Sequence, residues 1–160
     1  MSQVVTIGVY GFSLEAFLEA LRRADVRVLF DVRQRRGVRG AEYSWANAKR
    51  LQAALAEAWI AYEHHPELAP TTELRQVQYA EDDRQGVGKR SRAELAPQYR
   101  DRYIGEILDQ ADLETLVASL PGAGAGALFC VERDPEACHR SLVAERLEAE
   151  HGVAVTHLRP

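Results

Sequence analysis

Five short apolar runs, rich in β-branched residues, alternate along the chain with longer segments in which apolar residues recur every three or four positions. The runs resemble buried strands, and the segments between them have the period of amphipathic helices. The predicted strands are 4–10, 26–32, 59–65, 127–132 and 153–158. This order predicts a mainly parallel, twisted sheet of about five strands with helices on both faces. We therefore expect a single three-layer α/β domain over residues 1–160.

Start and stop signals of helices lie between these strands. The predicted helices cover 14–24, 44–58, 96–109, 112–119 and 135–150. Ser13 is expected to cap the first helix. Asp134 and Pro135 form a typical helix start, and Gly152 is expected to end the last helix.

Residues 66–93 are polar and have little apolar periodicity. Connections of this length in compact domains are often functional or mobile. The sequence therefore predicts a long polar loop, which contains the basic cluster KRSR at 89–92.

The charge of the chain is uneven. The formal net charge is −4, so the composition as a whole does not indicate a nucleic-acid-binding protein. The segment 33–40, however, contains four arginines within eight residues. Two basic segments in an acidic chain favour a phosphorylated small molecule or a nucleic acid as the partner.

The first twelve residues have neither the charged start nor the apolar core of a signal peptide. The chain also has no apolar run of the length that crosses a membrane. A cytoplasmic location without a membrane partner is therefore expected. In that compartment the two cysteines are expected to be reduced thiols.

In a parallel sheet the carboxyl ends of the strands meet at one edge, where ligands collect. Polar groups end several of the predicted strands, so we expect them to converge there. These groups are Tyr10, Asp31, Arg33, His64, His65, Cys130, Glu132 and Arg133.

The densest set of reactive side chains is the stretch CVERDPEACHR, which spans 130–140. Its thiols are candidate nucleophiles, because a thiol in the first turn of the last helix would have a lowered pKa. Carboxylates at strand ends are candidate acids or bases. The candidate catalytic residues are Asp31, Glu132, Cys130, Cys138 and His139.

Arginines beside the start of this helix suit a phosphate or a carboxylate. The candidate anion-binding residues are Arg33, Arg39, Arg133 and Arg140. Two plainer interpretations stay open: the arginines pair with Asp31 and Glu132, and the cysteines are packed side chains.

No metal site or cofactor is predicted from sequence motifs. The spacing Cys-x7-Cys-His is not a recognised zinc pattern, and the chain has no CxxC pair. It also has no Walker A loop, no GxGxxG fingerprint and no GxSxG elbow.

Four short stretches of the chain resemble one family, the domain of unknown function 488. They are TIG (6–8), DVR (31–33), EL (67–68) and CVERDPEACHRSLVAERL (130–147). The resemblance implies one α/β domain with an unassigned activity. By position it marks as functional Asp31, Arg33, Cys130, Glu132, Arg133, Cys138, His139 and Arg140.

The chain departs from the family pattern in two places. Gln34-Arg35-Arg36 stands where members often have Pro-x-Ser-Arg, and Leu68-Ala69 stands where Leu-Gly is common. Both changes bear on the loops that would select a substrate.

The favoured hypothesis is an enzyme that acts on a phosphorylated, nucleotide or nucleic-acid-like substrate in the crevice at the strand ends. One alternative is a non-catalytic nucleic-acid-binding module. Another is a thiol redox protein that uses Cys130 and Cys138. The residues do not define the reaction class, the substrate, the strand order or the oligomeric state.

Overall fold

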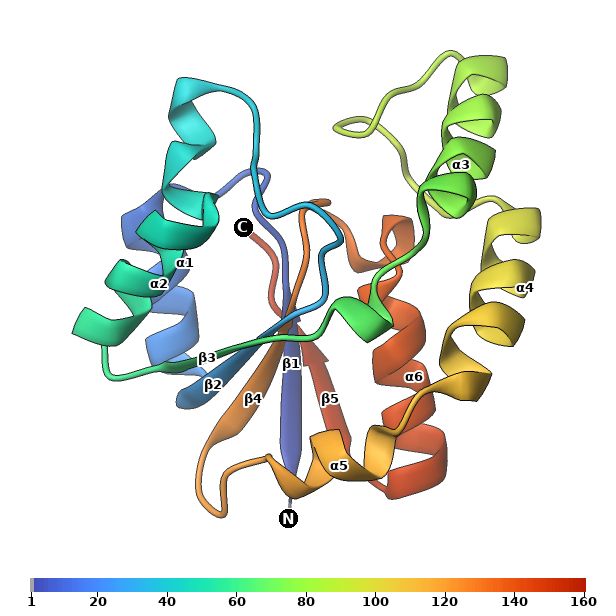
Figure 1. Ribbon diagram of the computed structural model, residues 1–160. Coiled ribbons are helices and arrows are strands. Elements are labelled where there is room, and N and C mark those ends of the chain that lie inside the picture. Colours follow the sequence, from blue (N-terminus) through green and yellow to red (C-terminus); the bar gives the residue numbers. More distant parts are fainter. Residues whose placement is uncertain (1) are drawn as a thin grey trace.

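A computed structural model of the chain describes residues 2–160 and contains one five-stranded parallel sheet (Figure 1). The strand order is β3-β2-β4-β1-β5, and every neighbouring pair is parallel. The strands are β1 (Gln3–Ile7), β2 (Val26–Asp31), β3 (Ala61–His64), β4 (Ala125–Phe129) and β5 (Ala154–His157). The expected α/β class with a parallel sheet is confirmed.

Helices cover both faces of the sheet (Figure 1). They are α1 (Leu14–Arg23), α2 (Ala48–Glu57), α3 (Thr72–Gln85), α4 (Pro97–Glu106), α5 (Leu113–Ala118) and α6 (Arg140–His151). All five residues of the central strand β4 are buried, as expected for a strand with helices on both sides. None of the helices in residues 2–160 is long and apolar enough to cross a membrane.

The strand order creates a crevice between β1 and β4. These strands are neighbours in the sheet, but the chain leaves β1 for α1 on one face and β4 for α6 on the other (Figure 1). The two connections therefore diverge at the carboxyl ends of the strands. Open parallel sheets bind ligands at such a switch point.

The predicted limits of two helices are confirmed. The Ser13 hydroxyl accepts a hydrogen bond from the amide of Ala16 at 3.1 Å and so caps α1. At the end of α6, Gly152 adopts the left-handed conformation with φ of 64°, which a glycine reaches without strain.

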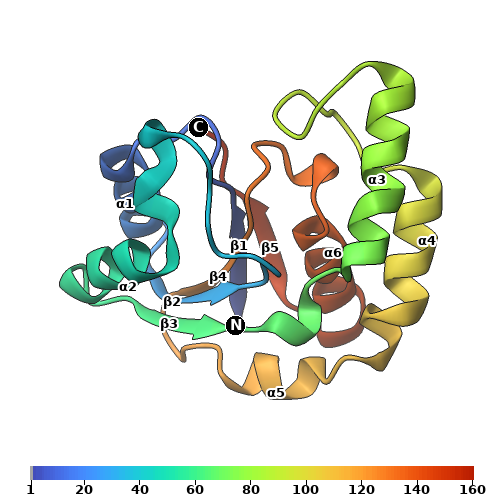
Figure 2. The same ribbon diagram turned by 45° about the horizontal axis from the view of Figure 1, so that its top comes forward.

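The prediction of a long loop at 66–93 is wrong, because α3 occupies residues 72–85. The buried side chains of this helix are Leu74, Gln78 and Asp82. Two of the three are polar, so the buried face of α3 carries no apolar stripe that a hydrophobic pattern could detect. After α3 the chain turns back toward the sheet before it enters α4 (Figure 2).

The predicted start of the last helix is also wrong. Residues 135–137 form a separate 3-10 turn, Cys138 has an extended backbone, and α6 begins at Arg140. The side chain of Asp134 makes no capping hydrogen bond. Similarly, the predicted helix at 44–58 is divided into a 3-10 turn at 41–46 and α2.

Candidate active-site pocket

A pocket of about 620 Å³ opens at the carboxyl edge of the sheet. Its walls come from the loop after β2, from α3, from the segment that joins α3 to α4, and from the turn between β4 and α6. Segments from distant parts of the sequence therefore enclose one volume. The pocket lies beside the switch point between β1 and β4, as the topology predicts.

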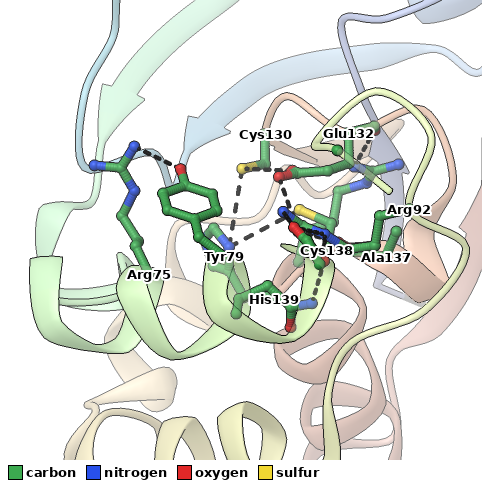
Figure 3. Close-up of polar contacts among 12 residues, drawn as sticks. Arg75, Tyr79, Arg92, Cys130, Glu132, Ala137, Cys138 and His139 are labelled. Atoms are coloured by element: carbon green, nitrogen blue, oxygen red, sulfur yellow. Dashed lines mark hydrogen bonds and ion pairs between the residues drawn. The ribbon is translucent and has the colours of Figure 1, made fainter. Parts of the chain in front are cut away.

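Four reactive side chains lie together at the inner end of the pocket: Cys130, Glu132, Cys138 and His139 (Figure 3). We call them the floor cluster. Each sulfur lies 3.9 Å from Nδ1 of His139, and the Cys130 thiol faces Oε2 of Glu132 at 3.7 Å. All four residues are less than a tenth exposed. The structure thus brings together four of the five predicted catalytic residues.

The orientation of His139 is set by the backbone. Its Nε2 lies 2.8 Å from the carbonyl oxygen of Val32. Because a carbonyl can only accept, Nε2 carries the proton and donates it. In the neutral ring Nδ1 is then a lone-pair acceptor that points between the two sulfurs (Figure 3).

The surroundings of the two thiols in the floor cluster shift their pKa in opposite directions. Burial raises the pKa of Cys130 well above its usual value. Burial also opposes ionisation of Cys138, but its contact with Cys130, the positive charge of Arg140 and the charge that His139 carries when its ring is protonated hold its pKa well below the usual value. Burial, and then the charge of Cys138, raise the pKa of Glu132.

A buried ion-pair network joins the floor cluster to α3. Arg92 donates to both carboxylate oxygens of Asp82, at 2.9 to 3.1 Å. It also lies 3.5 Å from Glu132 and donates to the carbonyl oxygen of Ala137 at 3.2 Å. Gln78 donates to the same aspartate at 2.9 Å. This network fixes one wall of the pocket to its floor.

The lining of the pocket is strongly basic. It contains seven cationic side chains, Arg33, Arg35, Arg39, Arg75, Lys89, Arg90 and Arg92, and Glu132 as its single carboxylate. Three of the seven pair with carboxylates, of Asp31, Glu42 and Asp82. The other four, which we call the basic wall, are Arg35, Arg39, Arg75 and Lys89, and no carboxylate within residues 2–160 forms an ion pair with them.

Tyrosine rings add flat surfaces to the same pocket. Tyr10, Tyr79 and Tyr99 line it. The Arg75 guanidinium donates to the Tyr79 hydroxyl at 2.9 Å (Figure 3), so a cation and a ring are presented side by side. Burial raises the pKa of Tyr99 well above its usual value, which keeps its hydroxyl protonated.

Asp31 and Arg33 form a closed pair at the end of β2. Arg33 donates from two nitrogens to the two carboxylate oxygens, at 2.9 and 2.8 Å. The Tyr62 hydroxyl adds a third bond to Asp31 at 2.6 Å. Asp31 is fully buried and does not line the pocket. The plainer interpretation, mutual pairing, describes both residues.

Two further arginines that the sequence predicts as anion ligands lie outside the pocket lining. Arg140 is fully buried and donates to the carbonyl oxygens of Glu132 and Arg133, at 2.7 and 3.2 Å. Its role here is to hold the turn after β4. Arg133 is exposed and does not line the pocket. Among the predicted anion ligands, the pocket is lined by Arg39 and by the already paired Arg33.

Sequence reasoning did not select the pocket residues from the segment that begins at α3. These are Arg75, Tyr79, Lys89 and Arg92. The KRSR cluster was a visible signal for two of them, but its position beside the floor was not predictable without α3. Arg75 and Tyr79 stand four residues apart, a spacing that places side chains on one helix face. That signal needs the helix to be predicted first.

Comparisons with known proteins place the chain in a family. Residues 13–147 match the family model described as the domain of unknown function DUF488. The chain belongs to this family. No curated protein matches the chain.

Among solved structures, a conserved hypothetical protein from Aeropyrum pernix K1 is similar, with 24% sequence identity and a TM-score of 0.38. The match covers 99% of this chain and 38% of that one. The chain thus spans less than half the length of this structural relative.

Proposed function

We propose that this protein is an enzyme that acts on a phosphorylated substrate, a nucleotide or a segment of nucleic acid, bound in the pocket at the carboxyl edge of the sheet. The observation that carries the proposal is the charge of the pocket lining. It contains seven cationic side chains and one carboxylate, in a chain whose formal net charge is −4. Positive charge concentrated in a cleft attracts anions and raises their local concentration.

The basic wall supplies the binding groups. Arg35, Arg39, Arg75 and Lys89 lack carboxylate partners within residues 2–160, so no ion pair in this part of the chain competes with an anionic ligand for their charge. Arginine forks match the geometry of phosphate oxygens, and lysine adds a point charge. The tyrosine rings that line the same pocket offer surfaces on which a base can stack.

The floor cluster favours an enzyme over a module that only binds. Contact with phosphates requires neither buried thiols nor a buried carboxylate. Glu132 and His139 are groups that can exchange protons with a substrate, and both line the pocket. Burial of such groups costs free energy even when they are partly paired, so their presence together in the pocket supports a functional role.

Turnover tests the proposal. Nucleoside mono-, di- and triphosphates and short single-stranded DNA and RNA would be incubated with the protein and analysed for new products. We expect at least one to be converted, and Glu132→Gln to lower kcat by roughly 10²–10⁴, the usual contribution of a general acid or base. The double variant R35A/R75A should raise KM by about tenfold or more.

A matched control variant removes two positive charges outside the pocket. Lys49 and Arg50 are exposed and lie outside the pocket, so K49A/R50A should convert the same compound at the wild-type rate. If no compound is converted by the wild-type protein, or if K49A/R50A and R35A/R75A have the same KM, the proposal is wrong.

A thiol redox function is the second candidate, because the sulfurs of Cys130 and Cys138 lie within 4.8 Å of each other. Mild oxidation followed by mass analysis of the intact chain would detect an internal disulfide by the loss of two hydrogen atoms, whose two electrons pass to the added oxidant. Rapid formation that a dithiol reverses, without turnover of any phosphorylated compound, would favour this function over the first.

A further inference from the structure

We propose that Cys130, Cys138 and His139 bind one zinc-class divalent ion, with the fourth coordination position open to the pocket. Sγ of each cysteine and a ring nitrogen of His139 all lie within 4.8 Å of one another, and all three side chains are buried. These donors come from the end of β4 and from the residues just before α6. The turn between β4 and α6 brings them together.

The distances fit one small ion. Zinc binds sulfur at about 2.3 Å and histidine nitrogen at about 2.0–2.1 Å, so tetrahedral geometry separates the S and N ligands by roughly 3.5 Å. Nδ1 of His139 lies 3.9 Å from each sulfur. A shift of a few tenths of an ångström would bring Nδ1 to this separation from each sulfur, and the two sulfurs, which lie within 4.8 Å of each other, would approach to roughly 3.8 Å.

The imidazole of His139, in its neutral form, already has the orientation of a metal ligand. Nε2 donates to the carbonyl oxygen of Val32 at 2.8 Å, which leaves the Nδ1 lone pair directed at the two sulfurs. Histidines that bind metals almost always donate their other ring nitrogen in this way. Within residues 2–160, the hydrogen-bond contacts of Nδ1 are those two sulfurs at 3.9 Å, which is long for a hydrogen bond.

Ligand type selects the metal. Two thiolates and an imidazole suit zinc and disfavour magnesium, calcium and manganese, which prefer oxygen. Binding would form two metal–sulfur bonds and one metal–nitrogen bond, and it would displace the proton from any ligand group that still carries one. All three ligand residues line the pocket, so a water or a substrate oxygen would take the fourth position.

Glu132 stands beside this site without belonging to it. Its Oε2 lies 3.7 Å from Sγ of Cys130, yet it is not part of the group of donors that lie within 4.8 Å of one another. Three protein ligands with an open position are the arrangement of catalytic zinc, whereas structural sites use four. Glu132 is therefore placed to hold a proton of a metal-bound water.

Metal titration tests this inference. Reduced protein freed of metal by a chelator would be titrated with Zn²⁺ against a chromogenic zinc chelator, and with Co²⁺ while its absorption is followed. We expect one ion per chain. Cobalt should give a thiolate-to-metal charge-transfer band in the near ultraviolet and the visible bands of tetrahedral cobalt.

Single substitutions distinguish the three proposed metal ligands from the neighbouring Glu132. C130S, C138S and H139Q should each bind Zn²⁺ more than about 100-fold more weakly, because losses outside the ligand set already cost about 10–100-fold. E132Q should bind one ion and keep the charge-transfer band, and it is the control for disturbance of the turn. Far-ultraviolet circular dichroism would establish that each variant is folded.

The inference is wrong if the reduced wild-type protein binds no zinc, if cobalt shows no thiolate band, or if the ligand variants bind as tightly as E132Q. Binding of pyrophosphate to the basic wall does not depend on the metal. A protein that binds pyrophosphate but no zinc would therefore contradict the metal site alone. A protein that binds zinc but no pyrophosphate would contradict the proposed function alone.

Discussion

The carbonyl oxygen of Glu132 lies directly against the α-carbon of Gly8, where the chain leaves β4 and β1. A Cβ atom at Gly8 would overlap this carbonyl group and would also lie 3.3 Å from Nη1 of Arg140. The same carbonyl oxygen accepts a hydrogen bond from Arg140 at 2.7 Å. Three residues thus fix the backbone from which the floor cluster projects.

Gly8→Ala should therefore destabilise the protein, by about 1–3 kcal/mol or more, because the added methyl group displaces the Glu132 carbonyl. Gly105→Ala is the matched control. Gly105 lies within α4 with no atom within 4 Å of the position of an added Cβ, so this change should stabilise the protein by about 0.5–1 kcal/mol. Urea denaturation measures both, and equal effects would contradict the packing described here.

The Arg92–Asp82 ion pair should contribute strongly to stability. Both side chains are 5% exposed, and Arg92→Met would leave a buried carboxylate with Gln78 as its remaining side-chain partner. Removal of one member of a buried pair costs about 3–5 kcal/mol. Arg84 lies on α3, as Asp82 does, but it is 71% exposed and pairs with Glu81. Arg84→Met should therefore change the free energy of unfolding little.

Denaturant unfolding of the two variants at neutral pH makes this comparison directly. If Arg92→Met and Arg84→Met unfold at the same denaturant concentration, α3 is not anchored to the floor through Arg92.

His157 should make stability depend on pH. Burial, and then the charges of Arg140 and Arg159, lower its pKa below the usual value of 6.5. As pH falls, the unfolded histidine takes up its proton before the folded one, so the free energy of unfolding decreases below about pH 6.5. In the folded protein its Nδ1 lies 2.7 Å from the hydroxyl of Thr6.

His157→Gln removes this titration. The stability of the wild-type protein relative to the variant should fall as pH is lowered from about 8 to about 5.5, on either side of the ordinary histidine pKa. Chemical denaturation at each pH measures the difference. A difference that is constant or grows toward acid pH would contradict the lowered pKa.

The succession of strands and helices along the chain could be predicted because most of these elements carry an apolar stripe or run. α1 is an example, with Phe17 and Leu21 buried at the spacing that a helix requires. α3 could not be predicted, since it buries Gln78 and Asp82, and these residues look like solvent-exposed ones in a hydropathy pattern. The burial of Asp82 is compensated by Arg92 and that of Gln78 by the amide of Ala96, and both partners lie outside the helix.

The place of the candidate site was predictable for a similar reason. Parallel strands bring their carboxyl ends together, which is how Arg35 and Arg39, after β2, reach one pocket with Cys130 and Glu132, after β4. The partners of individual arginines were not predictable. Whether an arginine faces a ligand or a buried carboxylate depends on contacts between distant segments, as between Arg33 and Asp31 or between Arg92 and Asp82.

Binding of inorganic pyrophosphate tests the central claim most directly, because it requires the basic wall and no knowledge of the true substrate. Calorimetric titration at low salt should show saturable binding by the wild-type protein and by K49A/R50A, about tenfold or more weaker binding by R35A/R75A, and loss of affinity as salt is added. Absence of binding to the wild-type protein, or equal affinity of the two double variants, would contradict the assignment of this pocket to a phosphorylated ligand.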